Sequence, residues 1–139
     1  MYVVILGAGR IGVRLARWML DSGSEVTLIE LNRRRLEIVK QSLGEVAIQG
    51  DGCSSLVLGE AGLSRADIFV ATTGADDVNL LTCQVAKHHY GVEKTISIVY
   101  LPEHEDLFKM LGVDMTINIS NLAIESLETG MADLFVEEV

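Results

Sequence analysis

The chain has 139 residues, of which 49% are hydrophobic, and its formal net charge is −9. This length suits one domain, and the apolar content supports a buried core, which excludes an intrinsically disordered chain. The negative charge argues against nonspecific binding to nucleic acid or to an anionic membrane surface.

The chain begins with an apolar run of β-type residues at 2–6 that ends in Gly7-Ala8-Gly9-Arg10-Ile11-Gly12. A helical pattern follows at once, so the chain predicts a strand, a glycine turn and a helix with Gly-x-Gly-x-x-Gly spacing. Gly7 allows a tight turn, Gly9 lets a pyrophosphate approach the backbone, and Gly12 lets the helix lie close to the strand. The unpaired N–H groups of the first helical turn favour an anion, and Arg10 is placed to add a cationic contact.

A second strand at 25–30 ends in Glu30, which follows Gly12 by 18 residues. This spacing is close to the roughly 20 residues expected for the acidic residue that holds an adenosine ribose. Such a carboxylate accepts hydrogen bonds from both ribose hydroxyls and repels a 2′-phosphate. The alternative is that the glycines form only a tight turn and that Glu30 is a solvated strand end.

Four further strands and their helices follow with short turns. Asn32 caps a helix that begins near Arg33 and ends at Gly44, and a short helix from Ser54 or Ser55 stops at Gly62. Asp76 or Asp77 is expected to cap a longer helix through about His89, and Pro102 begins a helix over 103–111. Ser120 or Asn121 is expected to cap the last helix. The strands in this part of the chain are expected at 46–49, 67–72, 95–99 and 115–119.

Six alternations of strand and helix predict an α/β fold: a Rossmann-like, doubly wound, parallel six-stranded sheet with helices on both faces. In such a sheet, ligands bind outside the carboxyl ends of the strands where the strand order reverses. The glycine turn, Glu30, Asp51 and residues 72–74 all follow strand ends. The topology therefore predicts that they converge on one cleft.

The motifs resemble those of the TrkA-N domain, the RCK or KTN domain that regulates potassium channels and transporters. They are the glycine turn, Glu30, Gly50-Asp51, Glu60-Ala61-Gly62-Leu63, Ala66-Asp67, Thr72-Thr73-Gly74 with Asn79, Glu105-Asp106-Leu107-Phe108 and Leu111-Gly112-Val113-Asp114. The resemblance covers nearly the whole chain. It implies a nucleotide-binding domain at 1–120 and a C-terminal crossover helix and tail at 121–139.

The resemblance implies a nucleotide-sensing regulatory subunit or domain of a potassium uptake system, and no enzyme. The ligand would be NAD, as NAD+ or NADH, or alternatively ATP, ADP or AMP. The partners would be a membrane potassium channel or transporter subunit and further copies of the chain, from a dimer to an octameric ring. We expect a cytoplasmic protein, peripheral at the inner face of the cell membrane through the pore subunit, with no nucleic-acid partner and no membrane insertion of its own.

The resemblance also assigns roles to residues of the cleft. Gly7, Gly9, Arg10 and Gly12 would hold phosphates, Glu30 the adenosine ribose, and Asp51 with Gly52 would lie by the adenine. Thr72, Thr73 and Gly74 would line the far half, and the neighbouring Ala8, Ile11, Leu31 and Cys53 complete the expected cofactor-binding set. Many family members carry an arginine in the fifth strand that reaches the phosphates, but residues 97–99 are Ser, Ile and Val here.

Other chemistry finds weaker support in the sequence. His88 and His89 are adjacent on a helix and point about 100° apart, so with His104 they are expected to be solvated side chains, and no metal site is predicted. Cys53 lies near the expected cleft, but no partner thiol or base is visible, so two ordinary thiols are expected.

The main alternative function is an NAD-dependent oxidoreductase or its isolated dinucleotide-binding domain. Such an enzyme needs a general acid or base near the nicotinamide, and no group of His, Lys or Tyr side chains follows the sixth strand.

The last helix carries more apolar side chains than one packed face needs, which indicates a partner subunit. The alternative is that this helix folds back on its own sheet. The apolar side chains in question are Leu122, Ile124, Leu127, Met131, Leu134 and Phe135.

Overall fold

The computed structural model describes residues 1–137, without the side chains of residues 136 and 137. Its six strands are β1 (Tyr2–Leu6), β2 (Glu25–Glu30), β3 (Ala47–Gln49), β4 (Ile68–Ala71), β5 (Lys94–Val99) and β6 (Met115–Asn118). The α-helices are α1 (Arg10–Asp21), α2 (Arg33–Leu43), α3 (Ser55–Glu60), α4 (Asp76–Gln84), α5 (Glu105–Met110) and α6 (Ile119–Glu137). Two short 3-10 helices, η1 (Leu63–Arg65) and η3 (Pro102–His104), and one π-helix, η2 (Val85–His89), complete the set. Of the segment expected at 121–139, residues 138 and 139 lie outside the described residues.

The six strands form one parallel sheet in the order β3-β2-β1-β4-β5-β6. β1 is central: Ile5 stands opposite Leu28 of β2 on one side and opposite Val70 of β4 on the other. The strand order reverses between β1 and β4, which confirms the predicted doubly wound sheet. The carboxyl ends of these two strands therefore define where a ligand cleft is expected.

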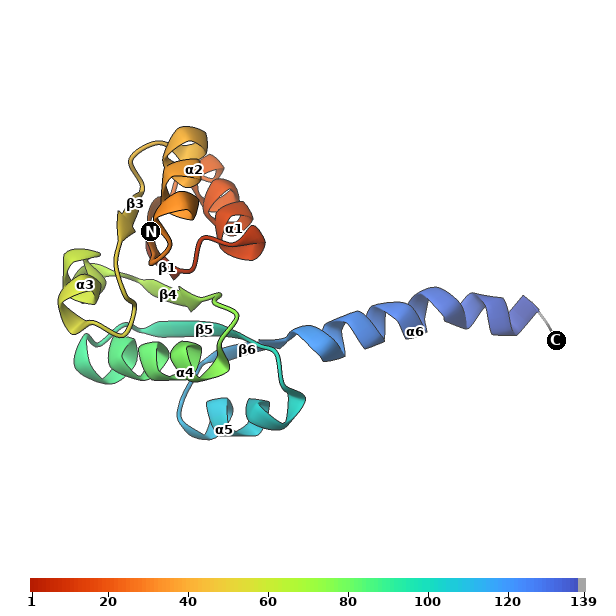
Figure 1. Ribbon diagram of the computed structural model, residues 1–139. Coiled ribbons are helices and arrows are strands. Elements are labelled where there is room, and N and C mark those ends of the chain that lie inside the picture. Colours follow the sequence, from red (N-terminus) through yellow and green to blue (C-terminus); the bar gives the residue numbers. More distant parts are fainter. Residues whose placement is uncertain (138–139) are drawn as a thin grey trace.

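Helices cover both faces of the sheet, as Figure 1 shows, with α1 and α2 on one face and α3, α4 and α5 on the other. Alternate side chains of β1 point to opposite faces, so Val3 and Ile5 pack with Ala16 of α1 and Val39 of α2. Val4 and Leu6 belong to the opposite core, which also holds Leu58, Cys83 and Phe108. Burial on both faces explains why β1 and β4 are nearly continuous apolar runs.

Two helix starts differ from the sequence expectation. The residue before α4 is Ala75, and neither Asp76 nor Asp77 is its N-cap, because the Asp76 carboxylate accepts hydrogen bonds from Tyr100 N and Leu101 N at 2.9 and 3.0 Å. The last helix begins at Ile119, and the side chain of Asn118 accepts the hydrogen bond of Asn121 N at 3.1 Å. The expected caps Ser120 and Asn121 thus lie two and three residues after the side chain that accepts this hydrogen bond. The long helix expected through His89 changes from α to π geometry after Gln84.

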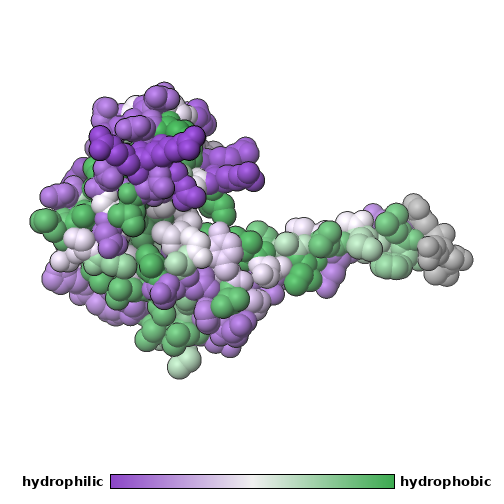
Figure 2. Space-filling model, in the orientation of Figure 1, coloured by the Kyte–Doolittle hydropathy of each residue, from purple (hydrophilic) through white to green (hydrophobic). Residues whose placement is uncertain are grey.

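The helix α6 leaves the body of the domain and extends away from it (Figure 1). The six apolar side chains noted in its sequence, Leu122 to Phe135, are 46–63% exposed, and Figure 2 shows hydrophobic side chains along the helix. The alternative that this helix folds back on its own sheet is therefore wrong for the described residues. Within residues 1–137, no helix is both long and apolar enough to cross a bilayer.

Candidate functional site

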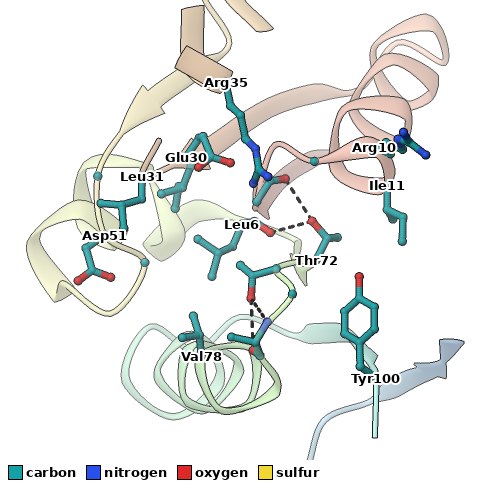
Figure 3. Close-up of a pocket in the computed structure, with 18 residues that line it drawn as sticks. Leu6, Arg10, Ile11, Glu30, Leu31, Arg35, Asp51, Thr72, Val78 and Tyr100 are labelled. Atoms are coloured by element: carbon teal, nitrogen blue, oxygen red, sulfur yellow. Dashed lines mark hydrogen bonds between the residues drawn. The ribbon is translucent and has the colours of Figure 1, made fainter. Parts of the chain in front are cut away.

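A cleft of roughly 600 Å³ lies at the carboxyl ends of β1, β2 and β4, where the strand order reverses. Figure 3 shows its walls: α1 and α2 on one side, the start of α4 and Tyr100 on the other, and Leu6 at its floor. Eleven of the expected residues line it, namely Gly7, Gly9, Arg10, Ile11, Glu30, Leu31, Asp51, Gly52, Thr72, Thr73 and Gly74. The topology thus brings these distant segments together, as predicted.

Three expected residues do not line the cleft: Ala8, Gly12 and Cys53. Ala8 is buried, and its backbone N–H donates to Glu30 Oε1. Gly12 faces the backbone of the turn, because a Cβ built there would lie 1.9 Å from the carbonyl oxygen of Gly7. These two residues shape the turn from behind, so they support the cleft without forming its surface.

The other two glycines of the turn have different surroundings. Gly7 has φ +102°, in the region that side-chain-bearing residues rarely adopt, and its N–H donates to Ile29 O at 2.9 Å. Gly9 has ordinary backbone angles, and a Cβ built there meets nothing within 4 Å. The absence of a side chain at Gly9 therefore serves no packing need of the fold and leaves space open above the backbone.

The N-terminus of α1 is suited to an anion. Gly9 is its N-cap and supplies no side-chain hydrogen bond, and no acidic residue stands in the first turn. The first N–H groups of the helix consequently lack protein partners of the usual kind, and the helix dipole adds positive potential. Arg10 begins the helix at this point.

Glu30 is the buried anion of the cleft, with 6% of its surface exposed. Its Oε1 accepts a hydrogen bond from Ala8 N at 2.9 Å, and its Oε2 accepts one from Asn32 N at 2.8 Å. Each carboxylate oxygen has a further lone pair for another donor. The backbone of the glycine turn and the cap of α2 thus hold one carboxylate in a fixed orientation at the end of β2.

The far wall is fixed by hydrogen bonds from β4 and α4. The Thr72 hydroxyl lies 2.9 Å from Leu6 O and 3.1 Å from Gly7 O, which ties β4 to the glycine turn. Asn79, which is fully buried, accepts from Thr73 N at 3.1 Å and donates to Thr73 O at 3.0 Å. The loop at 73–75 is therefore held rigidly beside the cleft.

The third segment of the cleft follows β3. Asp51 Oδ1 accepts from Cys53 N at 2.9 Å, and Gly52 lies so close to Leu6 that a Cβ there would meet its side chain at 2.5 Å. Desolvation and the neighbouring Asp51 carboxylate raise the pKa of the Cys53 thiol. A raised pKa disfavours the reactive thiolate, in keeping with an ordinary thiol.

Seven lining residues were not among those expected. Leu6, Ile29 and Val78 are apolar residues of strands and helix, and Gly50 and Ala75 belong to the loops on either side. Arg35 and Tyr100 are the chemically informative additions. The sequence could have predicted both. Arg35 lies in the first turn of the helix after β2, and Tyr100 directly follows β5, so both lie near the carboxyl ends of the strands.

The sequence suggested that His104 is a solvated side chain, but the structure gives its ring a partner. Its Nδ1 lies 2.9 Å from Asp76 Oδ2. Asp76 thus joins the start of α4 to the segment after β5, which includes Tyr100 of the cleft. Among the residues described, no group of three or more His, Cys, Asp or Glu side chains is arranged to hold a metal ion.

Comparison with known proteins places this geometry in a family. The family model of the TrkA-N domain matches residues 3–119. A "Trk system potassium uptake protein TrkA homolog" of Methanothermobacter thermautotrophicus is 41% identical over 128 residues, which are 92% of this chain and 59% of the relative. The chain spans about half the length of the curated relatives it matches.

Solved structures share the fold at lower identity. The GsuK channel bound to NAD superposes with a TM-score of 0.78 at 17% identity, covering 87% of this chain and 22% of the channel chain. The Kef CTD of Shewanella denitrificans in its AMP-bound form superposes with a TM-score of 0.75 at 22% identity, covering 99% of this chain and 92% of the other.

Proposed function

The chain belongs to the TrkA-N domain family, and on that premise we propose that it is the nucleotide-sensing regulatory part of a potassium uptake system. The ligand is NAD+ or NADH, or alternatively ATP, ADP or AMP. The observation that carries this proposal is the buried Glu30 carboxylate, oriented by Ala8 N and Asn32 N beside an uncapped helix N-terminus. A carboxylate in this place fits the hydroxyls of an adenosine ribose, and the helix end fits phosphates.

In this proposal the nucleotide lies along the cleft. Its ribose meets Glu30, its phosphates pass over Gly9 toward the first turn of α1, and its adenine lies by Leu31, Asp51 and Gly52. The open space above Gly9 supports this path, because no atom of the described residues lies within 4 Å of a Cβ built there. Thr72, Thr73 and Gly74 line the remaining part, where the second half of a dinucleotide fits. The structural neighbours bound to NAD and to AMP support a ligand of this class.

We place the chain among regulators and not among enzymes. A relative named for potassium uptake supports this reading. The alternative, an NAD-dependent oxidoreductase or its cofactor domain, needs an acid or base beside the nicotinamide. Among the described residues that line that side of the cleft, Tyr100 is the one with a titratable side chain (Figure 3). A sensor binds and releases NADH without oxidising it, whereas a dehydrogenase exchanges its hydride with a substrate.

The proposed partners follow from the family and from α6. A domain at 1–120 would bind the nucleotide, and the segment 121–139 would cross to a second copy within a dimer or a ring of up to eight. The ring would sit at the cytoplasmic face of the membrane, held there by a potassium channel or transporter subunit. The exposed apolar side chains of α6 support a subunit contact.

Calorimetric titration of the purified chain with NADH, NAD+, ATP, ADP and AMP tests the proposal. We expect saturable binding of at least one of these nucleotides with one site per chain. The absence of binding by all five would overturn the nucleotide-sensing function. Titration of Glu30→Ala in parallel separates binding in this cleft from binding elsewhere on the molecule.

A further inference from the structure

Three arginines stand side by side at the start of α2, but only one of them reaches the cleft. Arg33 pairs with Glu37 at 3.5 Å on the exposed surface of the helix, and Arg34 is exposed and does not line the cleft. Arg35 lines the cleft, and Figure 3 shows its side chain pointing from α2 into it, between Glu30 and Thr72. Arg35 is exposed like its two neighbours, but it alone of the three lines the cleft.

The charge around the cleft makes Arg35 significant. The chain carries a net charge of −9, and Glu30 and Asp51 add two carboxylates to the lining. Arg10 and Arg35 are the only Lys or Arg side chains among the described lining residues. Arg10, at the start of α1, is directed away from Arg35 in Figure 3. A polyanionic ligand therefore meets one cation that points inward.

Arg35 also has no competing partner in the part of the chain described. No ion pair joins it to a carboxylate, although Glu30 lines the same cleft. The Glu30 oxygens already accept hydrogen bonds from Ala8 N and Asn32 N. The five N–H donors of the Arg35 guanidinium thus remain available, in a planar fork that matches phosphate oxygens.

We propose that Arg35 is a specificity-determining residue that recognises the phosphate on the 5′ carbon of the adenosine ribose. The proposal rests on the nucleotide site proposed above and adds which ligands the site selects. Glu30 occupies the ribose hydroxyl side and repels a phosphate there. Arg35 reaches past Glu30 toward the glycine turn, where the 5′ chain runs to α1. Arg35 therefore favours AMP, ADP and NAD over adenosine and over 2′-AMP.

Arg35→Gln removes the charge while keeping a polar side chain, and Arg34→Gln removes the same charge one residue away, outside the cleft. Affinities of adenosine, AMP, ADP and 2′-AMP are measured for both variants and the parent by displacement of a fluorescent ADP analogue. We expect Arg35→Gln to weaken AMP and ADP about tenfold, which is about 1.4 kcal/mol and at the low end for a charged hydrogen bond. Adenosine affinity is expected to stay within about twofold, and Arg34→Gln to match the parent.

Each other result has a definite meaning. If Arg35→Gln weakens adenosine as much as AMP, Arg35 contacts the base and the phosphate assignment is overturned. If it weakens 2′-AMP more than AMP, the assignment to the 5′ side is overturned. If Arg34→Gln and Arg35→Gln lose the same affinity for AMP and ADP, the effect comes from net charge, and the specific role of Arg35 is overturned. A parent that binds none of these ligands, nor NADH, overturns the proposed function together with this inference.

Discussion

At the scale of single residues, Gly9 and Gly12 have opposite surroundings although they share one turn. A Cβ at Gly12 would overlap Gly7 O, whereas a Cβ at Gly9 meets nothing within 4 Å. Of these two positions, the fold itself therefore requires only Gly12 to be glycine. Gly9 is required only if a ligand uses the space above it, which makes the two positions a matched pair for experiment.

We expect Gly9→Val to abolish NADH binding while the fold survives. The branched side chain fills the space where the pyrophosphate approaches the backbone, and its cost to stability is at most about 1 kcal/mol, from a poorer N-cap. Gly12→Ala is the contrasting variant, with an expected loss of about 1–3 kcal/mol of unfolding free energy from overpacking. Calorimetry and urea unfolding measure both effects. If Gly9→Val binds NADH as tightly as the parent, the phosphates do not pass over this turn.

Glu30 is expected to select NAD(H) over NADP(H). Its carboxylate repels a 2′-phosphate, and we expect a preference of about 1–3 kcal/mol, the range for a charged group left imperfectly paired. Glu30→Gln should narrow this preference, because the neutral amide no longer repels the phosphate. It should also lower stability, since one of the N–H groups of Ala8 and Asn32 then faces an NH₂ group. Titration of the parent and of Glu30→Gln with NADH and NADPH measures the effect; equal affinities in the parent would remove Glu30 from the ribose.

At the scale of elements, Asp76 joins α4 to the segment that follows β5. Burial alone would raise the pKa of Asp76, but hydrogen bonds from Leu101 N, Tyr100 N and His104 together lower it below the ordinary 3.8. A lowered pKa in the folded state stabilises the fold above the unfolded pKa, and this stability is lost as the pH falls through the folded pKa. The link between α4 and the Tyr100 side of the cleft should therefore weaken in acid.

We accordingly expect the unfolding free energy of the parent to fall as the pH drops below about 4, and Asp76→Asn to reduce that dependence. Asp76→Asn should also be less stable than the parent at pH 7, by about 1–3 kcal/mol, because it weakens hydrogen bonds to a charged acceptor. Asp77→Asn is the matched control, since Asp77 is the exposed neighbour in the same turn. Urea unfolding from pH 7 to pH 3 measures all three proteins. Identical pH profiles for Asp76→Asn and the parent would contradict the role given to Asp76.

The sequence predicted elements well where one local signal dominated. The bounds of β2 and α2 follow from the apolar run that ends at Glu30 and from the Asn32 cap, whose side chain accepts from Arg35 N at 3.0 Å. The cleft residues after β1, β2, β3 and β4 were predictable because parallel strands present their carboxyl ends together.

The sequence-based predictions were wrong where a side chain forms hydrogen bonds with residues distant in the sequence and not with its neighbours. Asp76 has the residue type and position of a helix cap, but Tyr100 N and Leu101 N, 24 and 25 residues away, take its carboxylate. Arg35 was missed because it is one of three adjacent arginines, and only the packing of α2 on the sheet decides which of the three lines the cleft. Local sequence patterns do not predict such long-range contacts.

At the scale of the whole molecule, the chain consists of one domain with helices on both faces of its sheet and a last helix, α6, that extends away from it. The sheet is covered on both sides, whereas α6 extends away from β6 (Figure 1). The apolar side chains of α6 named above are exposed. Exposed apolar side chains repeated along one helix are costly in a monomer and usually mark a partner site. Because α6 does not fold back on its own sheet, we propose that a second copy of the chain packs against its apolar side chains.

We therefore expect the chain to form a dimer or larger assembly through 121–135. Phe135→Glu should convert it to a monomer, because the carboxylate would be desolvated in an apolar interface. Ser126→Glu adds the same charge to an exposed polar position of the same helix and should leave the assembly intact. The core of the domain does not include α6, so both variants should keep the same far-ultraviolet circular dichroism as the parent. Sedimentation velocity at tens of micromolar separates the outcomes: a monomeric parent rules out assembly through α6, and dissociation of both variants alike would assign the effect to charge and not to the apolar contact.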